Sequence, residues 1–342
     1  MTAKQRVYTA LRHEQPDICP WHFEFTVPAH RKMVALTGDP DFERKIGNHL
    51  HYIRAVRPDV WVEIAPDFWR DQFGVVWNRT IDKDIGNPHA HIFTEPTLGD
   101  YVWPDPDDPV RWAHVPGEIA AHPDQFVVIA IDFSLFERAW TMRGMENLMM
   151  DFIENPKFVH ELLGAITDYN IAQVRKALEY DIDAVYFGDD WGQQSGLQMG
   201  KQTWDAFILP QLKRMYGTVR GAGKKVFIHS CGDVDELFDD LIAAGVNCFN
   251  PFQPEVMDVA SLLVRYRGRL TFHGGLSTQR TLPYGTAEEV RRECRRLLDL
   301  GGHGSYILAP AHAVEGDVPL ENMLAFIDLV QQQKGALAEA AH

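Results

Sequence analysis

Short apolar runs recur along this chain at intervals that suit alternating strands and helices. Each run holds four to six residues, mostly β-branched, aromatic or other apolar types, as in strands buried within a parallel sheet. Because most runs are separated by amphipathic stretches, the pattern predicts a closed (β/α)8 barrel, the TIM-barrel fold. The eight predicted strands are Cys19–Phe23, Asp59–Ile64, Val127–Asp132, Ala184–Phe187, Lys225–His229, Asn247–Asn250, Leu270–His273 and Tyr306–Ala309.

The stretches between the strands carry helical spacing and helix-boundary residues. Lys157–Leu178, Thr203–Ala222 and Ala287–Leu300 are the clearest helices, with Pro156 at one start and Gly301 at one end. An open, doubly wound sheet is the alternative to the barrel. No G-x-G-x-x-G follows a strand, so nothing indicates a dinucleotide-binding fold. We expect one domain, residues 1–342.

One segment interrupts the alternation. Residues 65–126 join the second and third predicted strands through a stretch rich in Trp, Pro and Asp. Long excursions in compact domains are usually functional, so we expect an inserted lid or subdomain over the barrel mouth. Trp69 and Trp77 are its candidate substrate-binding aromatics. Contact between subunits is the alternative role, and we expect a homodimer from the family resemblance described below.

Composition and charge limit the choice of partners. The chain has 33 basic and 48 acidic residues, a net charge of −15, which disfavours nucleic acid and anionic membranes as partners. No run approaches the roughly 18 apolar residues of a membrane span, and the N-terminus lacks the apolar core of a signal peptide. Four scattered cysteines form no disulfide framework. We therefore expect a cytoplasmic protein that acts on a small molecule.

Polar or titratable side chains follow every predicted strand, at the end where barrel enzymes place their active sites. The most informative case is K-V-F-I-H-S-C-G, in which His229 and Cys231 end the fifth strand. They suit a metal site or a nucleophile with its base; an inert buried thiol beside a hydrogen-bonded histidine is the alternative. The other candidates at strand ends are His22, Glu24, Asp132, Asp189, Asp190, Gln253, His273 and His312.

Several longer motifs resemble the uroporphyrinogen decarboxylase superfamily, which includes cobalamin-dependent methyltransferases. The opening helix and first strand read R-V-Y-T-A-L-R-H-E-Q-P-D-I-C-P-W. The middle of the chain carries G-D-D-W-G, W-D-A-F-I-L-P-Q-L-K and I-H-S-C-G-D. The last strand and the start of the final helix read I-L-A-P-A-H-A-V-E-G-D-V-P-L-E-N. The resemblance covers nearly the whole chain and implies a (β/α)8 barrel.

The resemblance also implies a choice between two branches. True uroporphyrinogen decarboxylases carry an R-Q-A-G-R type motif whose arginines bind substrate carboxylates, whereas this chain has W-H-F-E-F, with His22 and Glu24. The methyltransferase branch binds zinc through H-x-C on the fifth strand and a later cysteine. His229 and Cys231 match the first two ligands, and His312 stands at the third position. Since decarboxylases also carry a histidine near this point, His312 is either a metal ligand or a substrate-binding residue.

Three functions follow from these features. The first is a zinc-dependent methyltransferase or demethylase that moves a methyl group from a small O-, N- or S-methyl compound to a corrinoid or tetrahydrofolate. The second is a decarboxylase of a small acid or tetrapyrrole, and the third is a non-catalytic corrinoid or tetrapyrrole binder. No D-x-H-x-x-G corrinoid motif is present, so a corrinoid would arrive on a separate protein.

The expected roles divide the candidate residues into three groups. One zinc per chain would be held by His229, Cys231 and His312. Glu24, Asp189 and Asp190 are the candidate catalytic carboxylates, which would orient the substrate or donate a proton. Asp189 and Asp190 have two alternative roles, as a fourth ligand or as a helix cap. The expected substrate-binding residues are His22, Asp132, Gln253, His273, Trp69 and Trp77.

Overall fold

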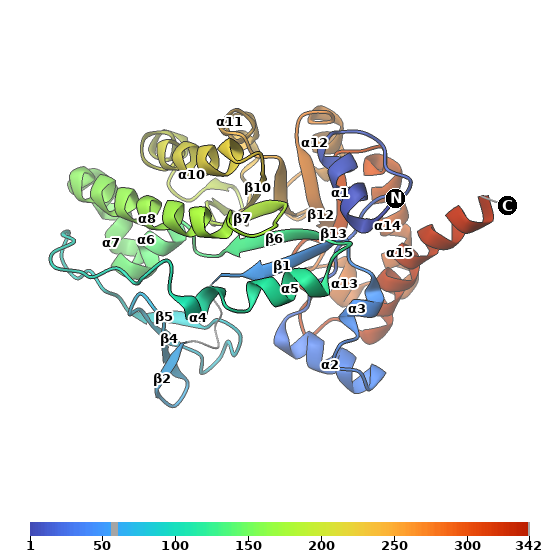
Figure 1. Ribbon diagram of the computed structural model, residues 1–342, viewed down its shortest axis with the longest axis horizontal. Coiled ribbons are helices and arrows are strands. Elements are labelled where there is room, and N and C mark those ends of the chain that lie inside the picture. Colours follow the sequence, from blue (N-terminus) through green and yellow to red (C-terminus); the bar gives the residue numbers. More distant parts are fainter. Residues whose placement is uncertain (56–60, 341–342) are drawn as a thin grey trace.

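A parallel sheet surrounded by helices forms the body of the protein. The computed structural model describes residues 1–55 and 61–340. The sheet has seven strands in the order β1-β6-β7-β10-β11-β12-β13, every neighbouring pair parallel (Figure 1). The predicted α/β class is confirmed. The strands are β1 (Leu50–Arg54), β6 (Phe126–Ile131), β7 (Ala184–Gly188), β10 (Lys225–His229), β11 (Cys248–Phe252), β12 (Thr271–Leu276) and β13 (Tyr306–Pro310).

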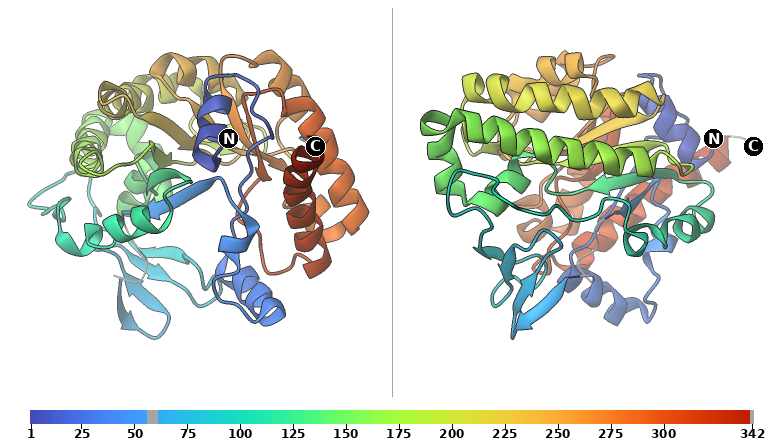
Figure 2. Two further views of the ribbon diagram at one scale, coloured as in Figure 1. Left: turned by 45° about the vertical axis from the view of Figure 1, so that its right-hand side comes forward. Right: turned by 60° about the vertical axis from the view of Figure 1, so that its left-hand side comes forward.

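Helices cover the outer face of this sheet, and the two views in Figure 2 show it curving between them. The long helices α8 and α10 lie side by side outside β7 and β10. The three predicted helices agree with α8, α10 and α14 within a few residues, except that the turns before α10 form a separate short helix and a π-helical turn. The larger helices are α1 (Ala3–Leu11), α2 (Val27–Thr37), α5 (Val115–Ala121), α6 (Phe136–Arg143), α7 (Met145–Glu154), α8 (Pro156–Ala177), α10 (Leu209–Gly221), α11 (Phe238–Ala244), α12 (Val259–Arg265), α14 (Ala287–Gly301) and α15 (Leu320–Ala340). The shorter elements are α3 (Glu43–Ile46), α4 (Pro109–Trp112), α9 (Lys201–Thr203), the π-helical turn η2 (Trp204–Ile208), the 3-10 turn η3 (Asp235–Leu237) and α13 (Thr281–Tyr284).

The two faces of the sheet bury two separate apolar clusters. Strand residues on the inner face, including Leu50, Phe126 and Phe227, pack with Val7 and Leu11 of α1. The larger cluster lies between the outer face and the helices. A reciprocal cap fixes the start of α1, since Thr2 Oγ1 accepts from Gln5 N at 3.2 Å and Gln5 Oε1 accepts from Thr2 N at 2.8 Å. The cap thus sets where α1 begins, and Val7 and Leu11 of this helix pack against the inner face of the sheet.

The first predicted strand, Cys19–Phe23, is present only as isolated bridges. Trp21 bridges to Leu308 of β13, and Trp21 O accepts from His49 N just before β1, so the segment contacts both edges of the sheet. Pro20 has no N–H to donate, and the side chain of Asn48 replaces a main-chain partner for Phe23 N. The missing N–H of Pro20 and the side-chain partner of Phe23 N explain why the regular pairing of this segment is interrupted.

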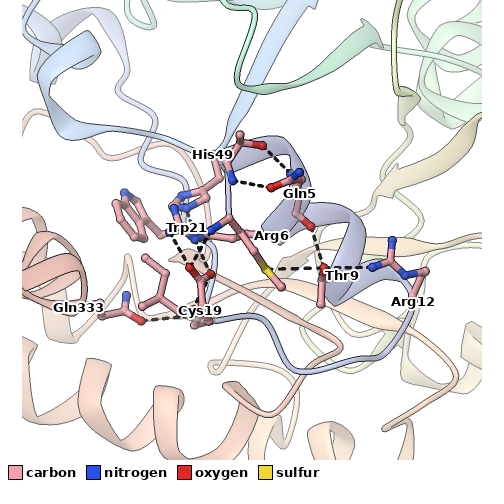
Figure 3. A network of polar contacts seen from close by, with 12 residues as sticks. Gln5, Arg6, Thr9, Arg12, Cys19, Trp21, His49 and Gln333 are labelled. Carbon is pink, nitrogen blue, oxygen red and sulfur yellow. Dashed lines mark hydrogen bonds and ion pairs between the residues drawn. The ribbon is translucent and has the colours of Figure 1, made fainter. Parts of the chain in front are cut away.

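The same segment is fixed by side-chain contacts (Figure 3). Cys19 N donates to Gln333 Oε1 at 3.2 Å, and Trp21 N lies 3.4 Å from His49 Nδ1. The Trp21 and His49 rings meet edge to face with centroids 4.1 Å apart. The segment is therefore fixed to α15 and to the residue before β1, which positions the following His22 and Glu24.

The second predicted strand was wrong. Asp59 and Val60 lie outside the described residues, and Val62–Ala65 forms β2 of a separate antiparallel sheet. The corresponding strand of the parallel sheet is β1, whose five residues bury only Leu50 and Ile53 fully. Its polar residues explain why an apolar-run criterion missed it.

The small antiparallel sheet lies between β1 and β6 in sequence and stands apart from the main sheet (Figure 1). A buried ion pair attaches it, because Asp71 Oδ2 accepts from Arg138 Nη1 of α6 at 3.0 Å. Asp71 also accepts from Phe73 N, Val75 N and Trp77 Nε1. The sheet contains β2 (Val62–Ala65), β3 (Phe68–Arg70), β4 (Val76–Asn78) and β5 (Asn87–Ala90). A further two-stranded ribbon contains β8 (Gly192–Gln193) and β9 (Gly196–Leu197).

Candidate functional site

His229, Cys231 and His312 converge at the carboxyl ends of the parallel strands. Their ligand atoms all lie within 4.8 Å of one another, and Cys231 Sγ is 3.3 Å from His229 Nε2. His229 is the last residue of β10, and His312 follows β13 by two residues. Parallel strands bring these positions together although 83 residues separate them in sequence.

Asn250 of β11 orients His229. Asn250 Nδ2 donates to His273 O at 3.1 Å, so Oδ1 faces His229 Nδ1 at 2.6 Å as the acceptor. The His229 proton therefore resides on Nδ1, and the Nε2 lone pair points toward Cys231. A hydrogen bond of this kind is the usual support for a metal-ligating histidine. Asn250 was not among the candidate site residues predicted from the sequence.

Asp190 and Gln253 hold the loop that carries Cys231. Asp190 Oδ1 accepts from Cys231 N at 2.7 Å and lies 3.6 Å from His229 Nε2, while Gln253 Oε1 accepts from Gly232 N at 2.7 Å. Burial and the nearby Asp190 carboxylate raise the pKa of the Cys231 thiol well above its ordinary value. A bound cation would reverse that effect, because metal ligation favours the thiolate.

The donor set fits a zinc ion. Two donors at about 2.0–2.3 Å from a tetrahedral ion lie roughly 3.3–3.6 Å apart, which matches the 3.3 Å between Cys231 Sγ and His229 Nε2. Two imidazoles and one thiol provide three ligands, so a fourth position would remain for water or substrate. His312 is exposed to solvent. Protein atoms packed around its ring, followed by the nearby His229, nevertheless lower its pKa, which favours the neutral ligating form.

Asp189 supports α6 and is held away from solvent. Its oxygens accept from Glu137 N at 2.8 Å, Leu135 N at 3.3 Å and Trp191 Nε1 at 2.6 Å. Burial outweighs these hydrogen bonds and raises its pKa to about 6. Of the roles considered from sequence, capping describes its contacts best, although the helix is α6 and not the one that follows Asp189.

Glu137 was not selected from the sequence, yet it is the carboxyl group that burial affects most clearly. Burial and the charges of Asp190, Asp189 and Asp132 raise its pKa well above the ordinary value. Glu137 follows Asp132 by five residues and lies in the first turn of α6. A titratable residue so soon after a strand end was the sequence signal that could have identified it. Glu137 thus places a carboxyl group whose neutral form is favoured beside the Cys231 loop.

Glu24 and Asp132 share one arginine that sequence reasoning missed. Arg54, the last residue of β1, donates to Glu24 Oε1 at 2.9 Å and to Asp132 Oδ2 at 3.2 Å. Burial opposes ionisation of Glu24, but Arg54 and His22 outweigh it and lower the pKa of Glu24 to about 2. Glu24 is therefore a carboxylate at neutral pH and holds no proton to donate.

His22 and His273 form a buried polar layer beneath the mouth. Their ring centroids are 5.6 Å apart, and His273 Nδ1 is 3.4 Å from Tyr52 OH. Burial lowers the pKa of His22 to about 4 and that of His273 well below its ordinary value. Among the described residues, both ring nitrogens of His22 lack a hydrogen-bond partner, and so does Nε2 of His273. Unpaired buried groups of this kind are costly without a ligand or water.

The two tryptophans of the small sheet differ in access. Trp69 is partly buried and lies beneath the Arg79 guanidinium, 5.1 Å from its ring centroid. Trp77 is 1% exposed and packs edge to face against Phe133, with centroids 5.2 Å apart. Trp69 is therefore the more accessible of the two tryptophans, whereas Trp77 is enclosed by its neighbours.

The sequence matches a known family over most of this region. A family model described as uroporphyrinogen decarboxylase (URO-D) matches residues 120–333. The chain belongs to the URO-D family. The matched segment includes β6 through β13 and, up to residue 333, also His229, Cys231 and His312, so the recognition made from motifs is confirmed.

Individual URO-D relatives carry two different activities in their names. A methylated-thiol–coenzyme M methyltransferase of Methanosarcina mazei is 23% identical over 256 residues, 73% of this chain and 65% of the relative. A uroporphyrinogen decarboxylase of Chlorobaculum tepidum is 23% identical over 183 residues, 52% of this chain and 50% of the relative. The alignments thus span about half to two thirds of these relatives.

A solved structure supports the fold over the whole chain. A methyltransferase from Methanosarcina mazei superimposes with a TM-score of 0.74 at 15% identity, covering 97% of this chain and 99% of that one. The arrangement of strands and helices is therefore shared with that protein. Among the helices of residues 1–55 and 61–340, none is both long and apolar enough to cross a membrane. The four cysteines, all within those ranges, are free.

Proposed function

We propose that the protein is a zinc-dependent methyltransferase or demethylase. It would move a methyl group from a small O-, N- or S-methyl compound to a corrinoid, carried on a separate protein, or to a folate acceptor. The observation that carries this proposal is the convergence of His229, Cys231 and His312 at the strand ends. The likeness to a methylated-thiol–coenzyme M methyltransferase supports it further.

The three converging residues would hold the zinc. Zinc would supply the ability to keep a thiol as thiolate, or to polarise an oxygen substituent, at neutral pH. Asn250 keeps His229 in the ligating tautomer, and Asp190 fixes the main chain of Cys231. These positions predefine the ligand geometry, so little reorganisation opposes metal binding.

The neighbouring side chains would bind and protonate the substrate. His22 and His273 offer unpaired ring nitrogens, and Glu24 with Arg54 offers a fixed charge pair at the mouth. Glu137 is the favoured proton donor to the leaving group, because burial favours the protonated form of its carboxyl group. Asp189 would act through α6, as its contacts are with main-chain N–H groups and Trp191.

A decarboxylase of a small acid is the second candidate. The raised pKa values of Glu137 and Asp189 favour it, since decarboxylation ends with protonation of a carbanion equivalent. Uroporphyrinogen itself is a poor fit. Arg54 is already neutralised by Glu24 and Asp132, so it is not available to a polycarboxylate substrate.

We extend the proposal to the remaining architecture. The segment 19–25 would close the sheet as the eighth strand of a (β/α)8 barrel. Residues 65–126, with their antiparallel sheet, would form a lid in which Trp69 contacts substrate. A homodimer in the cytoplasm is the expected working form.

A donor screen tests the proposal. Zinc-loaded protein should demethylate at least one member of a panel of methoxylated, methylamine and methylthiol compounds when cob(I)alamin or tetrahydrofolate is supplied. Cys231→Ser should abolish turnover and reduce bound zinc, because a hydroxyl is a much poorer zinc ligand than a thiolate. Cys294→Ala, at a buried cysteine on α14, is the matched control and should retain both. Turnover of uroporphyrinogen at an enzyme-like rate, or donor silence in zinc-loaded protein, would contradict the methyltransferase proposal.

A further inference from the structure

A second group of potential metal ligands lies away from the strand ends discussed above. His51 of β1, Glu118 of α5 and His122 immediately after α5 place one ligand atom each within 4.8 Å of the others. His51 Nε2 is 3.1 Å from Glu118 Oε2, and His122 Nε2 is 4.0 Å from the same oxygen. All three side chains are partly buried, with 19%, 45% and 15% exposure in that order.

The location separates this group from the candidate catalytic site. Leu50 and Tyr52 contribute to the inner cluster of the sheet, so His51, between them, faces outward toward α5. Figure 1 shows α5 running beside β1. His51 is the second residue of β1, near its amino end, whereas His229 and His312 lie at or beyond carboxyl ends. The group therefore joins a helix to the sheet and has no access to the mouth.

Gln125 fixes the tautomer of His122. Gln125 Nε2 donates to Asn48 O at 2.6 Å, so its Oε1 is the atom that faces His122 Nδ1 in a short contact. His122 thus donates from Nδ1 and keeps the Nε2 lone pair directed to the Glu118 side. This is the outer support that metal-ligating histidines generally have.

The charge and chemistry of the group favour a divalent cation. The His51 and His122 rings stack with centroids 3.6 Å apart and 16° between planes, so two imidazolium charges there would repel. Two ring nitrogens and one carboxylate oxygen are therefore available to a cation. Nitrogen and carboxylate ligands without a thiol suit Zn²⁺, Ni²⁺, Co²⁺ or Cu²⁺ better than Mg²⁺ or Ca²⁺.

The distances require only a small adjustment. Two nitrogens bound to one tetrahedral ion lie about 3.3 Å apart. The ligand atoms of His51, Glu118 and His122 are at most 4.8 Å from one another. Side-chain rotations that move an atom by about 1.5 Å would close the set. We propose that His51, Glu118 and His122 form a second site for a first-row divalent metal, one that ties α5 to β1 and stabilises the fold. This proposal does not rest on the proposed function.

Metal titration of a protein lacking the first site tests it. The full chain carrying His229→Ala, Cys231→Ser and His312→Ala would be titrated with ZnCl₂ and NiCl₂ by calorimetry and by thermal unfolding. We expect about one ion per chain and a rise of the unfolding temperature with metal concentration, as binding to the folded state requires. Adding His122→Gln should weaken binding at least tenfold and remove the temperature rise.

Two further variants separate a metal site from a purely structural cluster. Gln125→Ala keeps all three ligands, and should lower affinity about 10- to 100-fold while leaving the stoichiometry at one. His30→Gln is the matched control, because His30 forms a histidine–carboxylate pair with Glu43 at 3.5 Å; it should change nothing.

If the triple substitution prevents folding, the metal stoichiometry of otherwise wild-type protein is measured in its place. We expect two ions per chain in wild-type protein and one in the His122→Gln variant. The proposal would be overturned if neither metal raised the unfolding temperature of the folded triple variant. It would also be overturned if wild-type protein bound a single ion that survived His122→Gln.

Discussion

Asn250 offers a sharp test of the candidate zinc site because it touches a proposed ligand without being one. Its Oδ1 accepts from His229 Nδ1 at 2.6 Å, and its Nδ2 is committed to His273 O at 3.1 Å. Asn250→Ala removes the acceptor that holds the ligating tautomer. The proton of His229 is then free to move to Nε2, where it competes with the metal.

The expected effect follows from the role of such outer contacts. Loss of a hydrogen-bond partner to a ligating histidine typically lowers metal affinity 10- to 100-fold, about 1.4–2.7 kcal/mol. Competition with a chromogenic chelator at fixed pH would measure the zinc dissociation constant directly. Asn250→Asp retains an acceptor oxygen and should keep the affinity within a few-fold of wild type.

A second asparagine near the same strand provides the control. Asn247 Oδ1 accepts from Val226 N at 3.0 Å, at the opposite end of the strand pair from His229. Asn247→Ala should lower the free energy of unfolding and leave zinc affinity unchanged. The reasoning is refuted if folded Asn250→Ala binds zinc as tightly as wild type, or if both alanine variants lose affinity equally.

Three further predictions concern the lid and the buried histidines. Asp71→Asn should lower the free energy of unfolding by about 3–5 kcal/mol, measured by urea denaturation, because it leaves Arg138 buried without its partner. Trp77→Ala should cost about 3–5 kcal/mol of stability, whereas Trp69→Ala should mainly weaken substrate binding in a fluorescence titration; dissociation of a dimer in Trp69→Ala would instead favour the interface role. The pKa of His22 is lowered to about 4, so between about pH 6.5 and 4 the unfolded chain binds a proton that the folded protein does not, and stability falls as the pH falls. His22→Gln should flatten this dependence, and an unchanged profile would show that His22 does not contribute to it.

Much of the fold was accessible from local pattern. Six of the seven strands of the parallel sheet were predicted as apolar runs, because burial on both faces leaves a continuous hydrophobic signature. β1 was missed because its side chains His51, Tyr52 and Arg54 make polar contacts on both faces of the strand, which removes the apolar run. Residues 62–64 were assigned to the wrong sheet, because an apolar run does not specify its pairing partner.

The candidate site was predicted in part for a similar reason. His229 and Cys231 are two residues apart at one strand end, where barrel enzymes place their sites, and the family resemblance added His312 as the third position. Asn250, Arg54 and Glu137 were not selected as site residues because their importance lies in contacts between different strands and helices. A sequence read one strand at a time does not reveal such contacts.

The central claim is that His229, Cys231 and His312 hold one zinc ion. X-ray absorption at the zinc edge tests it most directly, using zinc-loaded His122→Gln protein so that the second proposed site does not contribute. The account predicts one sulfur at about 2.3 Å with nitrogen or oxygen donors at about 2.0–2.1 Å, and loss of the sulfur shell in the additional Cys231→Ser variant. A zinc spectrum without sulfur, or a sulfur shell that persists after Cys231→Ser, would contradict the account.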